Sequence, residues 1–421
     1  MGSSVMEKGR LCVGELKPGW KRVKFGDVVR QVKDKVDPTT AGVARFVAGE
    51  HMDTDDLRIR LWGEVNPQSL GPAFHMRFRP GQVLYGSRRT YLRKVALADF
   101  EGICANTTFI LESADPKVLL PDLLPFLMQT EGFHEHSKRE SKGSVNPYVN
   151  FSDLAWYEFA LPPLKEQERL RNLFGAVEQL RTNLVGAESA SRQLFRAAVD
   201  SLYSGTTGPG AGRERVRTGI GALPKHWVPR PLVEVCSIIR DGVHKRPKYV
   251  DRGIPFITVE NLTRGPRLDL TTSRYVTAKD HAVFTSRAKP EFGDVLLSKD
   301  GATLGVARIV DVHEEFSIFV SVALLKPIRE VLDGYFLRFF FESGFFRRLL
   351  ASKVSGSALP HIHLVDIRGT LIPMPPIHEQ REIGDLLQGV EGASRAIQAQ
   401  AVKHRDLQKH LYDRVFCDEV G

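Results

Sequence analysis

The stretch Leu161-Pro162-Pro163-Leu164-Lys165-Glu166-Gln167 decides how this chain is organised, because it occurs twice. The second copy is Met374-Pro375-Pro376-Ile377-His378-Glu379-Gln380. A proline pair ends the preceding element and presets φ for a helix start, where its missing N–H is not needed. The glutamate that follows lies in the first turn, where the helix dipole favours negative charge. The sequence therefore predicts a tandem repeat, and each copy ends in a helix.

Each copy of the motif opens an apolar pattern of about forty residues in which the steps alternate between 3 and 4, as in a coiled coil. At ~1.5 Å per residue, forty residues form a helix of roughly 60 Å. One such helix is not stable alone in water, so we expect the two to pack antiparallel; the alternative is an ordinary amphipathic core helix. The predicted stripes are Leu170, Leu173, Val177, Leu180, Leu184, Ala187, Ser191, Leu194 and Ala198, and Ile383, Leu386, Val390, Ala393, Ile397, Gln400, His404, Leu407 and Leu411.

The repeat covers nearly the whole chain. Trp20 and Trp227 open the two copies, and a glycine turn leads into a β-rich strand at Gly81 and again at Gly293. The pattern predicts an α+β fold, with two mixed, β-rich domains in tandem repeat, joined by two long antiparallel coiled-coil helices. The predicted parts are a flexible tail (1–19), a first domain (20–161), a first helix (162–203), a flexible glycine-rich linker (204–222), a second domain (223–374), a second helix (375–416) and a C-terminal tail (417–421).

Two further segments recur. A helix-like run, Leu123–Glu131 or Tyr335–Glu342, precedes a basic, hydroxyl-rich loop. The loop is Ser137–Tyr148 in the first copy and Ser352–His361 in the second. The middle of each domain differs, because 43–72 has no visible counterpart in 241–289. Two related domains with different middles are expected to contact different ligand features.

Composition limits the function classes. The formal charge is +9 and the pI is about 9.3, which favours an anionic partner, with nucleic acid first. The four cysteines have no metal-binding spacing. No apolar run approaches eighteen residues, and the N-terminus lacks the apolar core of a signal peptide, so we expect a cytoplasmic protein without a membrane span.

Three catalytic or metal-binding interpretations find little support in the sequence. Asn146-Pro147-Tyr148 is one proline short of an amino-methyltransferase motif and has no upstream glycine-rich cofactor loop. Pro121-Asp122 with Glu140-Ser141-Lys142 fits a nuclease pattern that the second copy does not share. His361 and His363 are too few ligands for a metal site. We therefore expect no catalytic residue, no metal and no cofactor in this chain.

An opening tryptophan, a Gly-Asp/Gln-Val-Leu strand, a Gly-Ser loop and a Pro-Pro-(Leu/Ile)-x-Glu-Gln helix occur twice in this order. Over about residues 20–416 the chain resembles the DNA-specificity subunit of type I restriction–modification systems. The resemblance implies that each domain is a target recognition domain for one half of a split, asymmetric site on double-stranded DNA. It implies that the helices fix the distance between the half-sites and dock two methyltransferase subunits, which restriction–translocase subunits join to form the endonuclease complex. S-adenosylmethionine, ATP and Mg²⁺ would be used by those partners, and the methyltransferase would flip an adenine.

Basic, hydroxyl and aromatic residues of the recurring loops are the candidate DNA contacts, because phosphate contacts set register and base edges carry sequence. They are Arg88, Arg89, Tyr91, Arg93, Lys138, Arg139, Lys142, Ser144, Asn146 and Tyr148 in the first copy, and His244, Lys245, Arg246, Lys248, Lys299, Lys353, Ser357, His361 and His363 in the second. Helix glycines cost ~1 kcal/mol each relative to alanine, so a close partner approach is the predicted reason for them. They are Gly175, Gly186, Gly384, Gly389 and Gly392.

Other functions stay open at this point. The same family includes the possibility of a specificity subunit in a methylation-only complex, or of a stand-alone DNA-binding remnant. A protein of another class, a coiled-coil scaffold with incidental basic charge, would lack the steep salt dependence of a protein that contacts DNA phosphates. An enzyme that uses Asn146 or Asp122 would show methyl transfer or cleavage by the isolated chain.

Overall fold

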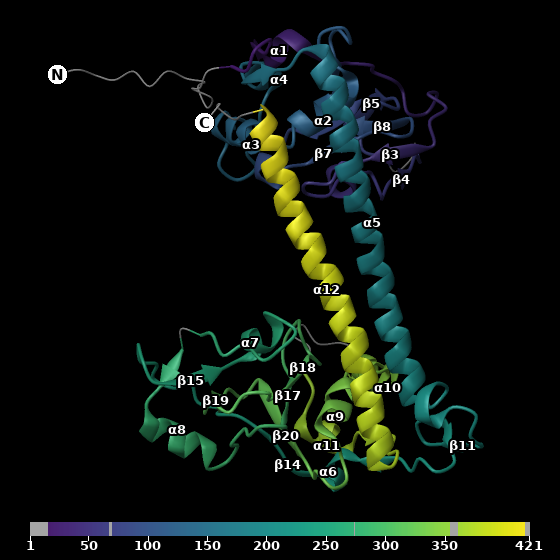
Figure 1. The fold of residues 1–421 in the computed structure, drawn as a ribbon, viewed down its shortest axis with the longest axis vertical. Coiled ribbons are helices and arrows are strands. Elements are labelled where there is room, and N and C mark those ends of the chain that lie inside the picture. The colour runs from purple at the N-terminus through teal and green to yellow at the C-terminus, as the bar shows by residue number, and fades with distance from the viewer. Residues whose placement is uncertain (1–15, 67–69, 273, 354–360, 417–421) are drawn as a thin grey trace, which may run out of the picture. The chain divides into compact units, whose positions relative to one another are not determined.

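The computed structural model describes residues 16–66, 70–272, 274–353 and 361–416. The chain divides into two compact units, Met1–Val185 with Ala399–Gly421 (unit 1) and Gly186–Gln398 (unit 2). Two helices of 40 residues contribute to both units. Helix α5 (Leu164–Tyr203) begins in unit 1 and ends in unit 2, whereas α12 (Ile377–Phe416) begins in unit 2 and ends in unit 1 (Figure 1).

Unit 1 contains two four-stranded sheets. The strands are β1 (Lys21–Lys24), β2 (Val29–Val32), β3 (Arg45–Val47), β4 (Gly63–Glu64), β5 (Phe74–Phe78), β6 (Val83–Gly86), β7 (Val95–Leu97), β8 (Gly102–Ala105), β9 (Thr108–Ser113) and β10 (Glu158–Leu161). The short helices are α1 (Phe25–Val28), η1 (Gly49–His51), η2 (Thr90–Leu92), η3 (Pro121–Leu123), α2 (Leu124–Leu127), α3 (Glu131–Arg139) and α4 (Phe151–Leu154). The sheet orders are β2-β9-β6-β7 and β4-β3-β8-β5, and β1 pairs with β10.

Unit 2 repeats this plan. Its strands are β11 (Arg215–Thr218), β12 (Gly221–Pro224), β13 (Arg230–Pro231), β14 (Cys236–Asp241), β15 (Ile254–Ile257), β16 (Tyr275–Val276), β17 (Val295–Ser298), β18 (Ala307–Ile309), β19 (Ser317–Ile318), β20 (Val322–Pro327) and β21 (Leu371–Ile372). Its shorter helices are η4 (Gly208–Gly210), α6 (Leu232–Val235), α7 (Val259–Thr263), α8 (Ala278–Thr285), α9 (Gly334–Phe340), α10 (Gly344–Lys353) and α11 (Leu364–Gly369). The sheet orders are β14-β20-β17-β18 and β16-β15-β19, and β13 pairs with β21.

The two units therefore share a topology, and the predicted α+β fold class is confirmed. The likeness extends into the divergent middle: β3 pairs in parallel with β8 in unit 1, and β15 pairs in parallel with β19 in unit 2. The expectation that the middles have no counterpart is thus corrected at the level of backbone. What differs is the edge of this sheet, where unit 1 has β5 and unit 2 has the helix α8 instead.

The central strand of each unit separates two apolar cores. Val83 and Tyr85 of β6 face one cluster and Leu84 faces the other, because successive side chains of a strand point to opposite faces. In unit 2, Val295 and Leu297 of β17 face one cluster and Leu296 faces the other. All of these side chains are nearly fully buried. Burying each contributes on the order of 1.5–3 kcal/mol.

The glutamine of the repeated motif fastens each long helix to its unit. Gln167 Nε2 donates to the carbonyl oxygens of Val118 (2.8 Å) and Pro162 (2.9 Å), and its Oε1 accepts from Leu120 N (2.8 Å). Gln380 makes the same three hydrogen bonds at the equivalent positions of the second copy, to Val331 O (2.9 Å), to Pro375 O (2.9 Å) and from Asp333 N (3.0 Å). Both side chains are buried, so these bonds are shielded from water. The motif is therefore a packing signature as well as a helix start.

The structure confirms the helix-like runs before the basic loops only in part. In unit 1 the run breaks after α2, and α3 begins at Glu131, where the Thr130 hydroxyl accepts from Phe133 N. In unit 2, α10 begins at Gly344, shortly after α9. The second helix of each pair extends into the predicted loop, so Lys138 and Arg139 are helical residues. Gly132-Phe133 and Gly344-Phe345 therefore lie in the first turn of these second helices.

The predicted linker is not a flexible connection where the structure describes it. It contains η4, β11 and the start of β12, and the two strands pair as a hairpin. A Cβ on Gly205 would clash with the Pro224 ring, and one on Gly210 would lie 2.9 Å from Trp227 Cζ2. The glycines are needed for close packing around the buried Trp227, and this corrects the prediction of flexibility. The predicted tails at 1–15 and 417–421 lie outside the described residues.

Only alternate positions of each predicted apolar stripe are buried or half-buried in the structure. Leu170 and Ile383 are buried, but the stripe members spaced seven residues apart are exposed. The exposed members are Leu173, Leu180, Ala187 and Leu194 on α5, and Leu386, Ala393, Gln400 and Leu407 on α12. The long helices bury a neighbouring face because they pack on the cores of the units and not only on each other. In unit 1, for example, Phe174 and Tyr412 stack edge to face with ring centroids 4.8 Å apart.

Candidate nucleic-acid interface

In unit 1 the end of β6 is joined to the basic loop by backbone hydrogen bonds. Val149 N donates to Ser87 O (3.0 Å), and Arg89 N donates to Pro147 O (2.6 Å). Arg88 and Tyr148 form an isolated antiparallel β-bridge. The loop closes on itself, because Lys142 and Tyr148 exchange N–H···O bonds of 2.8 and 2.9 Å. Gly143 adopts φ +89°, which a glycine tolerates without strain.

This pairing brings most of the predicted first-copy residues together at the surface. Arg89 Nε donates to Asn146 Oδ1 at 3.0 Å, so the two segments are also joined through side chains. Tyr91 is 51% exposed and Tyr148 is 44% exposed. We call the exposed residues of this group the unit 1 loop cluster: Arg88, Arg89, Tyr91, Lys142, Ser144, Asn146 and Tyr148. The cluster combines guanidinium donors, an amide and two aromatic rings, which suits contact with phosphates and base edges.

Four predicted residues of this copy form ion pairs within the protein: Arg93, Lys138, Arg139 and Lys142. Arg93 is half-buried, with Nε 2.6 Å from Asp55 Oδ1 and Nη1 2.6 Å from Glu131 Oε1. It fastens η2 to α3 instead of extending outward. Lys138 and Arg139 are exposed at the end of α3, where Lys138 pairs with Glu135 at 2.9 Å. Lys142 is also paired, with Asp153 at 2.9 Å, but stays exposed at the surface.

In unit 2 the equivalent backbone pairing recurs with different side chains. Ile362 N donates to Lys299 O (3.0 Å), as Val149 N does to Ser87 O in unit 1. Asp300 forms an isolated β-bridge with His361, as Arg88 does with Tyr148. The Asp300 carboxylate also contacts the His361 ring, and His361 Nε2 lies 3.3 Å from His363 Nδ1. Lys299 is buried and therefore cannot be an exposed contact in this conformation.

Asp241 organises the rest of this surface and was not found from the sequence. It ends β14, is 4% exposed, and receives Lys299 Nζ (3.8 Å), Arg287 Nη2 (3.2 Å) and His244 Nε2 (3.3 Å). Its place in the sequence could have identified it, because Asp241 is an acid at the end of a strand, directly before a basic loop. We call the group of Asp241, His244, Arg287, Lys299, Asp300, His361 and His363 the unit 2 loop cluster.

The remaining predicted residues of the second copy either lie apart from the unit 2 loop cluster or lie outside the described residues. Lys245, Arg246 and Lys248 follow β14, and Arg246 lies 5.7 Å from the Tyr249 ring centroid. Ser357 lies outside the described residues, as does the side chain of Lys353, the last residue of α10.

The predicted partner-contact glycines divide into two groups. A Cβ on Gly175, Gly186, Gly389 or Gly392 would meet no other described atom within 4 Å, so these positions are open. Gly384 is buried, and a Cβ there would lie 3.4 Å from Tyr335 Cβ within its own unit. The reason for Gly384 is therefore the close approach of α9 to α12, and we do not include it in a partner surface.

The catalytic and metal-binding alternatives gain nothing from the geometry. Asn146 is occupied by Arg89, and among the described residues no group of three or more His, Cys, Asp or Glu side chains could hold a metal ion. Burial raises the pKa of both described free cysteines, Cys104 and Cys236, to about 12, which suppresses thiolate chemistry. None of the helices in the described part of the chain has the length and apolar character of a membrane span.

Comparison with known proteins gives consistent matches. Residues 224–402 match the family model described as "Type I restriction modification DNA specificity domain". The chain is 20% identical over 390 residues to the type I restriction enzyme MjaVIII specificity subunit of Methanocaldococcus jannaschii, covering 88% of this chain and 86% of that protein. It is 26% identical over 174 residues to the EcoKI specificity subunit of Escherichia coli, covering 40% of this chain and 36% of that protein.

Solved structures share the fold. A chain from a study of complex assembly and conformational transition in the type I restriction–modification system matches with a TM-score of 0.59 and 23% identity, over 95% of this chain and 98% of that one. The type I restriction–modification S subunit from M. genitalium matches with a TM-score of 0.55 and 13% identity, over 96% and 99% of the two chains. At these identities the structural likeness supports the arrangement of elements.

Proposed function

Because this chain belongs to the family of DNA-specificity subunits of type I restriction–modification systems, which are non-catalytic, we propose that its two units recognise different halves of one split DNA sequence. The proposal extends the shared function, DNA sequence specificity, to a division of labour between the units. It also assigns the two loop clusters as the DNA-contacting surfaces.

One observation carries the proposal: the same backbone pairing presents different chemistry in the two units. Arg88 in unit 1 and Asp300 in unit 2 occupy equivalent places after the central strand, opposite Tyr148 and His361. An arginine donates two hydrogen bonds and suits guanine, whereas a carboxylate accepts and suits the amino group of cytosine. Two scaffolds with opposite hydrogen-bonding character at one position support an asymmetric target sequence.

The test is loss of sequence-specific DNA binding by unit-specific variants. Modified-base sequencing of DNA from cells with and without this gene first identifies the split, adenine-methylated motif. In binding assays on that motif, Arg88→Ala should weaken affinity by about 1–3 kcal/mol and relax specificity in one half-site only. His361→Ala should relax the other half-site. A palindromic methylated motif would contradict the proposal.

A matched control is available in unit 1. Lys138→Gln changes an exposed charge that already pairs with Glu135, so it should alter the salt dependence of binding slightly and leave base preference unchanged. If Lys138→Gln relaxes specificity as much as Arg88→Ala, the unit 1 loop cluster is not the base-recognising surface.

The exposed rows of the long helices support a second part of the proposal, the docking of methyltransferase subunits. Leu180 (49% exposed), Leu194 (63%) and Leu407 (59%) are large apolar side chains in the heptad rows of the two helices. The open positions Gly175, Gly186, Gly389 and Gly392 lie on the same helices and would admit a closely packed partner. Restriction–translocase subunits would join this assembly, with S-adenosylmethionine, ATP and Mg²⁺ used by the partners.

Helix variants test the docking directly. Gly175→Leu and Gly389→Leu should leave the chain folded, since each new side chain points into open space, but should weaken co-purification with the methyltransferase subunit. Gly384→Leu is the contrasting variant, because it meets Tyr335 and should destabilise the isolated chain. If Gly175→Leu and Gly389→Leu assemble normally but unfold more readily, the docking surface is elsewhere.

A further inference from the structure

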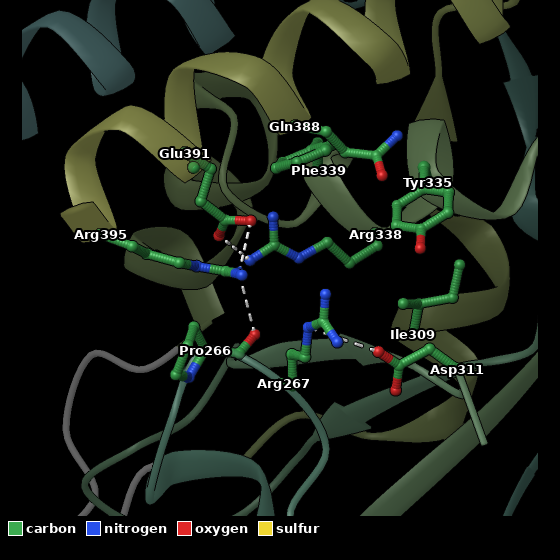
Figure 2. A pocket seen from close by; sticks show the side chains of 11 residues that line it. Pro266, Arg267, Ile309, Asp311, Tyr335, Arg338, Phe339, Gln388, Glu391 and Arg395 are labelled. Atoms are coloured by element: carbon green, nitrogen blue, oxygen red, sulfur yellow. Dashed lines mark hydrogen bonds and ion pairs between the residues drawn. The ribbon is translucent and has the colours of Figure 1, made fainter.

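Unit 2 contains a cavity of about 210 Å³ whose lining includes three arginines (Figure 2). Arg338 comes from α9, Arg395 from α12, and Arg267 from the segment between α7 and β16. Two carboxylates, Glu391 and Asp311, lie beside them. Glu391 pairs with both Arg338 and Arg395, and Asp311 pairs with Arg267, so three positive charges face two negative ones in the lining.

Arg338 is the best-defined donor of this cavity. It is 4% exposed, and its Nη2 donates to Glu391 Oε1 at 2.6 Å. Within the described residues its buried Nη1 has no hydrogen-bond acceptor, and neither has the buried Nε of Arg395. Buried guanidinium N–H groups are normally paired, because burying a charged donor without an acceptor is costly. The two nitrogens are therefore donors without a partner in the described part of the protein, and an acceptor in the cavity reaches them only when the side chains shift to expose them.

The surroundings add to the positive potential. A neighbouring cavity shares Pro266, Arg338, Glu391 and Arg395 with the first and is also lined by Arg308. Burial, and next the charge of Arg338, lower the pKa of Arg308 to about 10, while Glu342 and Glu391 act in the opposite direction. Its side chain donates to the carbonyl oxygens of Gly265 and Ala307, which are neutral acceptors.

We infer that this cavity binds a small phosphate-class oxyanion beside the Glu391 carboxylate that Arg338 and Arg395 share, with these two arginines as donors and Arg267 at the rim. A guanidinium fork matches the oxygens of a phosphate in two parallel hydrogen bonds, and a tetrahedral anion can accept from several arginines at once. Sites for drug-sized ligands begin at about 300 Å³, so the anion itself fits this smaller cavity better than a whole nucleotide. The inference does not depend on how the units recognise DNA.

Inorganic phosphate is the probe for this site. It is titrated into the full chain at constant ionic strength maintained with sodium chloride, and binding is followed by ³¹P NMR and by the rise in Tm. We expect saturable binding of one phosphate per chain and a Tm increase that chloride alone does not give. A Tm that rises equally with chloride, or a ³¹P signal that is unaffected by the protein, would overturn the inference and leave water in the cavity.

Variants locate the site. Arg395→Gln and Arg267→Gln should each weaken phosphate binding, by about tenfold for Arg395→Gln, since each removes a charge-assisted donor. Arg267 is 77% exposed, so its variant should fold even if the other does not. Arg171→Gln, an arginine on α5 in unit 1, is the matched control and should bind phosphate normally. Equal losses in the control and the site variants would count against the assignment.

Duplex DNA distinguishes the remaining source of phosphate. If a non-specific duplex binds, inorganic phosphate does not, and Arg395→Gln and Arg267→Gln lower DNA affinity, the arginines contact the DNA backbone and the inference is wrong. If phosphate binds and these variants leave DNA affinity unchanged, the site is separate from DNA recognition, as inferred.

Discussion

The two units differ most at the place where the sheets and short helices of each unit meet the long helices. Glu178 of unit 1 and Glu391 of unit 2 are equivalent in the repeat, and each accepts hydrogen bonds from arginine. In unit 1, Arg181 lies between Glu178 and Asp56, and Gln408 Nε2 donates to Glu178 at 3.0 Å. In unit 2, position 394, equivalent to Arg181, is a serine, and Glu391 is shared by Arg338 and Arg395.

The pattern of ion pairs at the two equivalent junctions therefore differs through few substitutions. In unit 1 the Arg181 side chain lies between Glu178 and Asp56, all about a tenth exposed, and Arg60 also pairs with Asp56 at 2.9 Å. Unit 2 has two arginines around one acid, together with a cavity. A duplicated scaffold can thus keep its backbone hydrogen bonds while one copy uses the junction for stability and the other gains a binding site.

Removal of Arg181 should have the largest effect on this comparison. Arg181→Met leaves the buried Glu178 without its arginine and Asp56 paired with Arg60 alone, which costs about 3–5 kcal/mol. Hydrogen–deuterium exchange should show the loss in peptides of unit 1, while peptides of unit 2 stay protected. The equivalent Ser394→Ala should change protection by only about 0.5 kcal/mol or less. Similar losses in both variants would show that the junctions do not differ as described.

The motif glutamines should behave alike, because their hydrogen bonds are the same. Gln167→Ala and Gln380→Ala should each destabilise their own unit by about 2–4 kcal/mol, since buried backbone groups lose their partners. Urea unfolding followed by fluorescence separates the units, because Trp227 lies in unit 2 and the other three tryptophans lie in unit 1. Gln179→Ala, an exposed position on α5, is the control. A large loss in one unit only would weaken the structural equivalence of the repeats.

Acid should affect unit 1 more than unit 2. Burial, and next the charge of Arg93, lower the pKa of His134 to about 4, and burial also lowers the pKa of His136. The unfolded chain then binds more protons than the folded one below pH 6.5, so stability falls as pH drops from 6.5 towards 4, by about 1–2 kcal/mol at pH 5 from His134. The equivalents in unit 2 are Arg347 and Leu349, which do not titrate in this range.

Replacing the histidine checks this directly. His134→Leu should flatten the Tm of unit 1 between pH 7 and pH 5, whereas His410→Gln, at an exposed position of α12, should not. Unchanged acid sensitivity in His134→Leu would assign the effect to other groups.

The smallest effect concerns the helix starts that the long helices cap. Asp413 Oδ1 accepts from Glu131 N at 2.6 Å in unit 1, and Asp200 Oδ1 accepts from Gly344 N at 2.6 Å in unit 2. Asp413→Ala and Asp200→Ala should each cost about 1 kcal/mol, as the loss of a helix cap does. Hydrogen exchange in α3 and α10 measures both. An effect of one variant on the helix of the other unit would contradict the pairing.

The candidate interface could be predicted as a region, but not residue by residue. The repeat register placed Arg88, Arg89 and Tyr148 in matching loops, because recurring spacing survives when side chains change. It could not show that Lys299 and Arg93 turn inward to Asp241 and Asp55, since such pairing depends on residues far apart in the chain. Asp241 itself was missed for the same reason.

The long helices show the same limit. Alternation of apolar residues by 3 and 4 identified them, and the proline motif placed their starts within two residues of the observed ones. The buried face was assigned wrongly at four of the nine stripe positions on each helix, because neighbours such as Leu173 and Phe174 are similarly apolar in sequence. Which of them is buried depends on the core that the helix meets.

The sequence by itself determined the duplication, the two helices and the family, because periodicity and repeated spacing are local properties of the chain. The tertiary structure decided which face of each helix is buried, which loop cations are neutralised, and that Arg338, Arg395 and Arg267 line one cavity. These outcomes depend on burial and on charges brought together from distant segments, and a charge has no fixed partner until the chain has folded around it.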